Sequence, residues 1–313
     1  MRSLFLASVA GVTLAAALTG LSGPAAAAQA GADDALAAKL KLHSHAALVL
    51  DQQSGEVLYG KNTQAIVPIA SITKLMTAMV VLDSNLDPEE SISIAKDDID
   101  WLRGSHSRLK VGAALSRDEL LRLALMASEN RAASALARSH PGGVEAFVRS
   151  MNLKAQMLGM NGSRFADATG LSSTNVSTAE DLATLARAAH RYPKIRQYST
   201  AIAFEVSLGG KHSVAFRNTN RLVSSGAWDI GLSKTGFINE AGRCLVMQAT
   251  LAGRAVIIVL LDSWGKYSRI GDANRIRKWI ELASVQGTSV NRAAAVRVRG
   301  ALSGIDSQAG PKS

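Results

Sequence analysis

The chain has 313 residues, of which 47% are hydrophobic and 19% are charged, and its formal net charge is +10. This size and composition suit one large domain or two small ones with a substantial core, and the positive balance favours anionic partners such as nucleic acid, acidic lipid or an acidic polymer. The sequence has no zinc-finger spacing, RNA-binding aromatic motif or Lys/Arg run, so we do not expect nucleic acid as a partner.

Residues 1–30 have the pattern of a secretory signal peptide. Arg2 precedes an apolar run that reaches Leu21, and small residues follow from Ala25 to Ala30. A charged start, a hydrophobic middle and a small-residue cleavage region are typical of a cleaved leader. An uncleaved anchor is the alternative, but polar and glycine residues dilute the apolar run. We therefore expect export, followed by a loose or helical lead-in over residues 31–42.

The first half of the remaining chain predicts a hairpin and then a helical block. Two short strands at 45–51 and 56–59 flank a glycine turn. Capping boxes at Ser116–Glu119 and Ser177–Glu180 mark two helix starts, and the second helix must stop before Pro193. The helices expected in chain order cover residues 71–82, 116–127, 144–157 and 177–192. Residues 91–192 thus form a mainly helical subdomain.

The hydrophobic period changes to two after residue 200, which indicates strands. These are expected at residues 203–208, 229–236, 243–251 and 254–261, followed by a helix at 267–284 that covers one face of the sheet. The single cysteine, Cys244, lies within one of these strands and is expected to be buried, and it excludes an internal disulfide. Strands from both chain ends therefore flank an inserted helical subdomain, which is an α/β (α+β) organisation with a cleft between the parts.

Ser71 and Lys74 form the first chemical motif. They are three residues apart at the start of an apolar helix, so they lie on one face of it. A serine hydroxyl becomes a strong nucleophile when a neighbouring base takes its proton, and a desolvated lysine is such a base. The unpaired N–H groups of a helix start also favour a developing negative charge. Taken alone, Ser-x-x-Lys is equally consistent with an ordinary amphipathic helix.

Two further short motifs follow in the order expected of one site. In Ser128-Glu129-Asn130 the outer side chains can relay a proton and hold a substrate amide. In Lys234-Thr235-Gly236 the lysine supplies charge, the threonine a hydroxyl, and the glycine leaves room for a substrate backbone along a strand edge. Each motif is weak evidence alone, but their combined order and spacing are specific.

With these motifs the chain resembles the low-molecular-mass penicillin-binding proteins over residues 43–285. The surrounding strings are similar to the D-alanyl-D-alanine endopeptidase branch of that family (penicillin-binding protein 7-like). These strings are residues 71–77, 128–133, 169–172 and 234–246. The resemblance implies a β-lactamase/transpeptidase-like fold, with an antiparallel sheet flanked by helices and an inserted all-helical subdomain.

The resemblance also implies the roles of the site residues. Ser71 attacks the D-alanyl carbonyl with Lys74 as base, and Ser128 relays a proton to the leaving amine. Asn130, Lys234, Thr235 and Gly236 position the substrate, and the N–H groups of Ser71 and Phe237 form the oxyanion hole. No metal ion and no organic cofactor are implied. The partners would be peptidoglycan stem peptides, with β-lactams as covalent inhibitors. The resemblance leaves open how the role of general base is divided between Lys74 and Lys234.

Three other functions are alternatives to an endopeptidase. A β-lactamase of class A needs a glutamate in a Glu-x-x-Leu-Asn loop, and no such string occurs in the sequence. A non-catalytic binding protein is disfavoured because all the reacting residues are present. A D-alanyl-D-alanine carboxypeptidase uses the same acyl-enzyme, but the related carboxypeptidases usually add a β-rich second domain, for which the residues after Val285 are too few.

The C-terminal segment, residues 286–313, predicts a mobile basic tail. It has scattered arginines and small residues but no sustained apolar period, whereas a stable membrane anchor needs a continuous apolar face or a lipid. We therefore expect a periplasmic enzyme that associates only loosely with membrane or wall.

Overall fold

A computed structural model describes residues 40–208 and 213–285. The expected signal peptide, most of the lead-in and the C-terminal tail lie outside the described residues.

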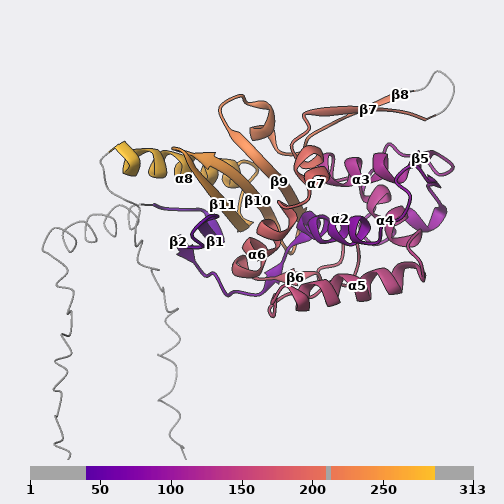
Figure 1. Cartoon of the computed structure of the whole chain (residues 1–313), viewed down its shortest axis with the longest axis horizontal. Coiled ribbons are helices and arrows are strands. Elements are labelled where there is room, and N and C mark those ends of the chain that lie inside the picture. The colour runs from indigo at the N-terminus through magenta and orange to yellow at the C-terminus, as the bar shows by residue number, and fades with distance from the viewer. Residues whose placement is uncertain (1–39, 209–212, 286–313) are drawn as a thin grey trace, which may run out of the picture.

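A five-stranded antiparallel sheet with the order β2-β1-β11-β10-β9 forms one part of the structure (Figure 1). Its strands are β1 (Ser44–Asp51), β2 (Val57–Lys61), β9 (Asp229–Ile238), β10 (Gly242–Leu251) and β11 (Arg254–Ser263). The strands predicted at 45–51, 56–59, 229–236, 243–251 and 254–261 are therefore confirmed, and they meet in one sheet. The strand predicted at 203–208 also forms, but it belongs to a separate two-stranded sheet.

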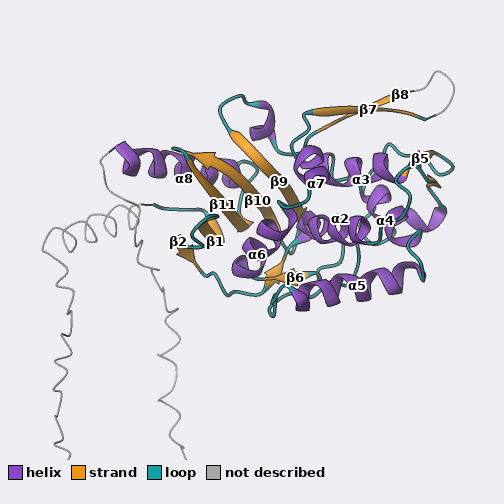
Figure 2. Ribbon diagram, in the orientation of Figure 1, coloured by secondary structure: helices purple, strands orange, loops and turns teal. Residues whose placement is uncertain are grey.

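Both faces of this sheet are buried, and Figure 2 shows helices on either side of it. Alternate residues of β11 face opposite ways: Ile257 and Val259 join the core with the helical block, whereas Ile258 and Leu260 pack with α8 (Ser268–Val285). This is why β11 is an unbroken apolar run in the sequence rather than an alternating one.

The helical block lies against the other face of the sheet. Its helices are α2 (Lys74–Asp83), α3 (Arg117–Met126), α4 (Asn130–Arg138), α5 (Gly143–Met157), α6 (Ala179–Ala189) and α7 (Pro193–Ser199). Every residue of α2 from Lys74 to Val81 is buried. Helix α2 contacts α3, α4, α5 and α6, so it forms the centre of the block. The residues at its first turn are thereby held rigidly in the interior.

Short strands and turns complete the described chain. The strand pairs are β3 (Val67–Pro68) with β6 (Val176–Ser177), β4 (Ser91–Ser93) with β5 (Ala114–Ser116), and β7 (Ala203–Ser207) with β8 (Ser213–Arg217). The 3-10 turns are η1 (Ala70–Thr73), η2 (Lys96–Asp98) and η3 (Arg221–Ser224). The β4–β5 pair forms a small two-stranded sheet within the largely helical segment, and residues 94–113 connect its strands.

Local chemistry explains most helix boundaries, with some differences from expectation. Ser116 caps α3 and its hydroxyl accepts a hydrogen bond from the Glu119 N–H, as predicted. Thr178, not Ser177, caps α6. Helices α4 and α7 were not predicted. Helix α6 ends at Ala189, before Pro193, as predicted. Pro193 itself occupies the first turn of α7, where its missing N–H has no intrahelical partner to lose.

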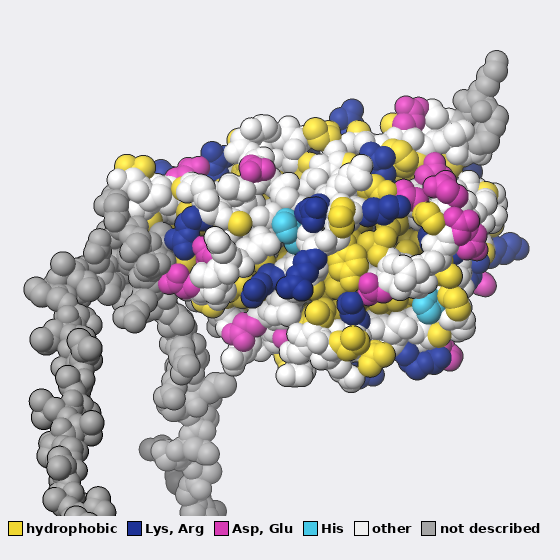
Figure 3. All heavy atoms as spheres, in the orientation of Figure 1, with side chains coloured by type: hydrophobic (Ala, Val, Ile, Leu, Met, Phe, Trp, Pro, Cys, Tyr) yellow, Lys and Arg dark blue, Asp and Glu magenta, His cyan; other side chains and the backbone are white. Residues whose placement is uncertain are grey.

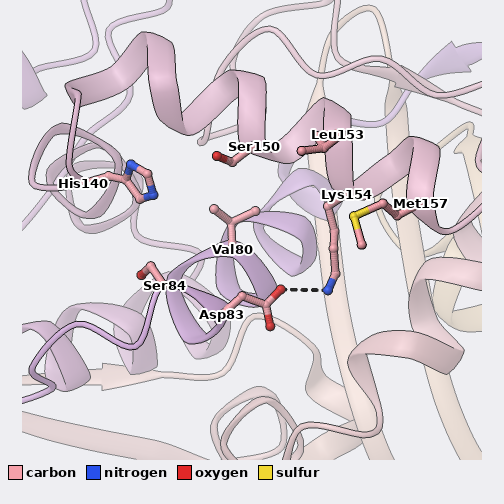
Figure 4. A pocket seen from close by; sticks show the side chains of 8 residues that line it. All are labelled: Val80, Asp83, Ser84, His140, Ser150, Leu153, Lys154 and Met157. Carbon is pink, nitrogen blue, oxygen red and sulfur yellow. Dashed lines mark hydrogen bonds and ion pairs between the residues drawn. The ribbon is translucent and has the colours of Figure 1, made fainter.

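On the face in Figure 3, hydrophobic side chains gather over the helical part, with lysines and arginines beside them. A pocket between the end of α2 and helix α5 has a volume of about 250 Å³ and is lined by Val80, Leu153 and Met157 among others. Figure 4 shows Lys154 from α5 reaching Asp83 at the end of α2, at 2.7 Å. This pocket lies at the opposite end of α2 from Ser71 and Lys74.

Candidate active site

The sequence predicted that Ser71 lies at the start of the helix. In the structure Ser71 lies in the 3-10 turn η1, just before α2 begins. The preceding residue, Ala70, has a φ of 48°, which is strained for a residue with a side chain. Lys74 is the first residue of α2 and is fully buried. The turn thus directs the Ser71 hydroxyl toward the buried amine of Lys74.

Two glycines allow other segments to approach this turn closely. A Cβ on Gly236 in β9 would lie 2.8 Å from the Ile69 carbonyl oxygen and 3.2 Å from the Ser71 nitrogen. A Cβ on Gly170, whose φ is +80°, would lie 2.0 Å from the Ala70 carbonyl oxygen. The absence of a side chain at both positions therefore lets β9 and the 166–175 loop pack directly against the Ser71 turn.

The Lys74 amine has three oxygen partners. It lies 2.8 Å from Ser71 Oγ, 2.7 Å from Asn130 Oδ1 and 2.5 Å from the Thr169 carbonyl oxygen. Burial lowers its pKa from 10.5 to about 7, while the negative charges of Asp167, Glu129 and Asp100 act in the opposite direction. A neutral amine can donate its two N–H groups to Asn130 and Thr169 and turn its lone pair toward the Ser71 hydroxyl.

A second group of bonds forms around Lys234. Its amine donates to Ser128 Oγ at 2.8 Å and to the Thr235 carbonyl oxygen at 2.9 Å. Ser128 has a φ of 58°, so it lies in a strained turn between α3 and α4. The pKa of Lys234 is well below its usual value, because its amine is buried and the charges of Lys74 and Arg269 repel it. The two lysines are thus close enough to repel each other.

The edge of β9 borders this pair of groups. Strand β9 is the last strand of the sheet, so its outer edge has no strand partner among the described strands. The Thr235 hydroxyl is 2.7 Å from that of Thr219, and Phe237 is half-exposed beneath the Arg243 guanidinium. All eight residues singled out from the sequence therefore lie in the two hydrogen-bonded groups or on this strand edge.

The sequence did not predict that the loop of residues 166–175 holds part of the site in place. Asp167 is its hub: one carboxylate oxygen accepts hydrogen bonds from the Thr169 N–H and hydroxyl and from the Gly170 N–H. The other oxygen accepts from the Ser172 N–H and the Asn175 side-chain amide. These bonds hold the Thr169 carbonyl against Lys74. A backbone carbonyl has no signature in a sequence, although the short-range Asp167–Thr169 pair is typical of an Asx turn.

Two other residues at the site were also missed. Ser105 accepts a hydrogen bond from the Asn130 side-chain amide at 2.9 Å, which orients that amide with its oxygen toward Lys74. Arg269 donates to the carbonyl oxygens of Gly236 and Cys244, and its Nε has no hydrogen-bond partner among the described residues. Both come from segments that carry no recognisable motif.

Comparison with known proteins gives the family of the chain. The profile of the D-alanyl-D-alanine carboxypeptidases (peptidase family S11) matches residues 32–265. The chain belongs to this family of serine D,D-peptidases. A D-alanyl-D-alanine endopeptidase of Pseudomonas aeruginosa is 50% identical over 246 residues, which are 78% of this chain and 79% of the relative.

Solved structures of family members have the same fold. The DD-transpeptidase of Streptomyces K15 has a TM-score of 0.72 at 30% identity, covering 77% of this chain and 97% of that one. Penicillin-binding protein D2 from Listeria monocytogenes, in its cefotaxime-bound form, has a TM-score of 0.69 at 29% identity, covering 77% and 98%. The fold class expected from the resemblance is therefore confirmed.

The described residues contain no group of three or more His, Cys, Asp or Glu side chains placed to hold a metal ion. Cys244 is buried, as expected, and burial raises the pKa of its thiol to about 11, so it is not a reactive thiolate. The nucleophilic and proton-transferring side chains that the structure brings together here include Ser71, Ser128 and the two buried lysines.

Proposed function

We propose that this serine D,D-peptidase cleaves D-alanyl bonds in peptidoglycan cross-links through an acyl-enzyme on Ser71. The observation that carries the proposal is the 2.8 Å contact between the Ser71 hydroxyl and the fully buried amine of Lys74, whose pKa is about 7. Such an amine is half neutral at pH 7 and can accept the hydroxyl proton as the oxygen attacks.

The remaining steps use the hydrogen-bonded group around Lys234 and Ser128. Ser71 Oγ bonds to the D-alanyl carbonyl carbon and its proton passes to Lys74. The C–N bond then breaks, and the leaving amine takes a proton through Ser128, which is hydrogen-bonded to Lys234. The N–H groups of Ser71 and Phe237 stabilise the oxyanion, which is worth about 3 kcal/mol per donor in related chemistry. Water finally hydrolyses the ester and restores the serine.

The substrate lies along the free edge of β9 in this proposal. The Asn130 amide holds the substrate backbone, while Lys234 and Thr235 face the carboxylate that follows the scissile bond. Arg269 adds a positive charge beside Gly236, and its buried Nε–H has no hydrogen-bond partner among the described residues. The residue that follows the scissile bond carries a carboxylate both in a cross-link and in a stem that ends in D-alanine. The same site can therefore bind either leaving group. The 50% identity to an endopeptidase favours the cross-link.

Digestion of purified cross-linked muropeptides tests the proposal, with the products separated by chromatography and identified by mass. An endopeptidase converts dimers to monomers without releasing free D-alanine. Release of D-alanine from pentapeptides with intact dimers would instead assign a carboxypeptidase. β-Lactams should block either reaction by acylating Ser71, and the acylated enzyme should last for minutes or longer.

We also propose that the enzyme works in the periplasm, with only loose attachment to membrane or wall. Within residues 40–208 and 213–285, no helix is long and apolar enough to cross a membrane. The basic chain attracts anionic polymers, but salt screens such attraction within about 8 Å at physiological ionic strength. Moderate salt should therefore release the mature protein from membrane fractions. Retention through high salt, with release only by detergent, would contradict this placement.

A further inference from the structure

The guanidinium of Arg103 joins three segments that border the candidate site. Its Nε donates to the Leu171 carbonyl oxygen, in the loop of residues 166–175, at 2.5 Å. Its two terminal nitrogens hold the carboxylate of Glu240 at 2.9 and 3.0 Å. Glu240 lies in the turn between β9 and β10, three residues beyond Phe237. The Arg103–Glu240 ion pair therefore connects the segment before β5 to the end of β9.

The Ser71 turn lies between the segments that this ion pair joins. On one side, Arg103 is two residues before Ser105, whose hydroxyl accepts a hydrogen bond from the Asn130 amide. On the other side, Gly236 of β9 packs directly against the backbone of the Ser71 turn. The ion pair thus bridges the two sides of the cleft in which Ser71 is placed.

The direction of the substrate determines which of its parts meets this bridge. In the proposed function, Lys234 and Thr235 face the carboxylate of the leaving group. The acyl portion must then extend the other way along β9, past Phe237 and toward Glu240. Because the ion pair crosses this path, a long acyl portion can reach Ser71 only when the pair is open.

The two partners of the ion pair are held with different firmness. The Arg103 N–H donates to the nearly buried carboxylate of Asp100 at 2.9 Å, and the Arg103 side chain is only 22% exposed. The Glu240 side chain is 48% exposed. Exposed side chains change rotamer within nanoseconds, and surface ion pairs are weak. Glu240 can therefore swing away from a fixed Arg103 without any movement of the backbone.

We propose that the Arg103–Glu240 ion pair is a gate that determines which acyl donors reach Ser71. The inference rests on the proposed function, because it takes a stem peptide as the acyl donor. The closed pair excludes the stem, so the fraction of open molecules scales the apparent affinity for long substrates. A compound without an extended acyl portion reaches Ser71 in either state. Glu240 thus sets specificity and takes no part in the bond-breaking step.

The test compares Glu240→Ala with the matched control Glu281→Ala. Glu281 is 44% exposed and pairs with Arg277 at 2.7 Å on α8, outside the site. Removing Glu240 opens the gate, so kcat/KM for a cross-linked muropeptide dimer should rise about fivefold, mainly through KM, as for loss of a weak surface ion pair. Acylation by 6-aminopenicillanic acid, whose acyl side ends at an amino group, should stay within twofold of wild type. Glu281→Ala should leave both reactions unchanged.

Binding gives a readout that does not depend on turnover. In a Ser71→Ala background, the Kd of the dimer measured by calorimetry should fall about fivefold when Glu240→Ala is added. An unchanged Kd would overturn the gate, and a raised Kd would overturn it by showing that Glu240 binds the substrate. Equal losses of activity toward the dimer and 6-aminopenicillanic acid would assign the ion pair a structural role instead.

Failure of the proposed function is distinguishable from failure of the gate. If the wild-type enzyme cleaves pentapeptide monomers but no dimers, the endopeptidase proposal fails. The gate then still requires the gain of about fivefold on stem pentapeptides, because their acyl portion follows the same path past Phe237.

Discussion

Acylation of Ser71 is expected to follow the deprotonation of Lys74, so the rate should depend on pH in a defined way. Burial lowers the pKa of this lysine from 10.5 to about 7, which corresponds to a destabilisation of the charged amine by about 5 kcal/mol relative to a lysine in water. Only the neutral form accepts the serine proton. The second-order acylation rate should therefore rise with pH, pass its midpoint near pH 7 and level off above it. Two pH units below the midpoint, roughly 1% of the amine is neutral, so the rate should be roughly 1% of the plateau.

The assay is a quenched time course with a labelled penicillin between pH 5 and 9. Far-ultraviolet circular dichroism at each pH provides the control that the enzyme stays folded. A rate that does not change across this range would refute the assignment of Lys74 as base. A midpoint above about pH 9 would also refute it, because it would mean that burial does not depress the pKa of the amine.

Four further variants test Lys74 and the neighbouring parts of the site. Lys74→Arg should acylate roughly a thousandfold more slowly, because a guanidinium does not release its proton, and an active variant would exclude Lys74 as base. Lys74→Met should be inactive but more stable at pH 7. A buried lysine must lose a proton on folding, so this gain should disappear as pH rises toward the unfolded pKa of about 10.4, which urea titrations at several pH values would measure. Gly236→Ala should slow acylation at least tenfold, since its methyl group would lie 2.8 Å from the Ile69 carbonyl oxygen, and an unchanged rate would contradict the close approach. Asp167→Asn should move the midpoint of the acylation profile to lower pH, because the Asp167 carboxylate raises the pKa of Lys74; a midpoint moving upward would contradict this.

The elements that depend on local chemistry were predictable from the sequence. The apolar runs of β10 and β11, the Ser116 cap of α3 and the one-turn separation of Ser71 and Lys74 all follow from short-range rules. Helix α4 was not predictable in this way. Its N-cap is Glu129, whose side chain accepts a hydrogen bond from the Arg131 N–H. Glutamate is not among the residues that usually mark a helix start, so the sequence carries no standard start signal at Asn130.

The sequence indicated the eight residues that gather around Lys74 and Lys234, but not the side chains of Ser105 and Arg269 or the backbone groups of the site. The Thr169 carbonyl that contacts Lys74 comes from 95 residues away, and the approach depends on Gly170 fitting against Ala70. No local pattern encodes such a contact, because it arises only when β3 and β6 pair and bring the two loops together. The left-handed backbone of Ala70 likewise belongs to a position that short-range propensity disfavours.

The central claim is that Ser71 carries the acyl group, and mass spectrometry of the penicillin adduct tests it most directly. Wild-type protein incubated with benzylpenicillin should gain the mass of one inhibitor, and peptide mapping should place it on the peptide that contains Ser71. Ser71→Ala should remain folded, gain no mass and cleave no muropeptide. An adduct mapped to Ser128 or elsewhere, or unchanged labelling of Ser71→Ala, would contradict the account.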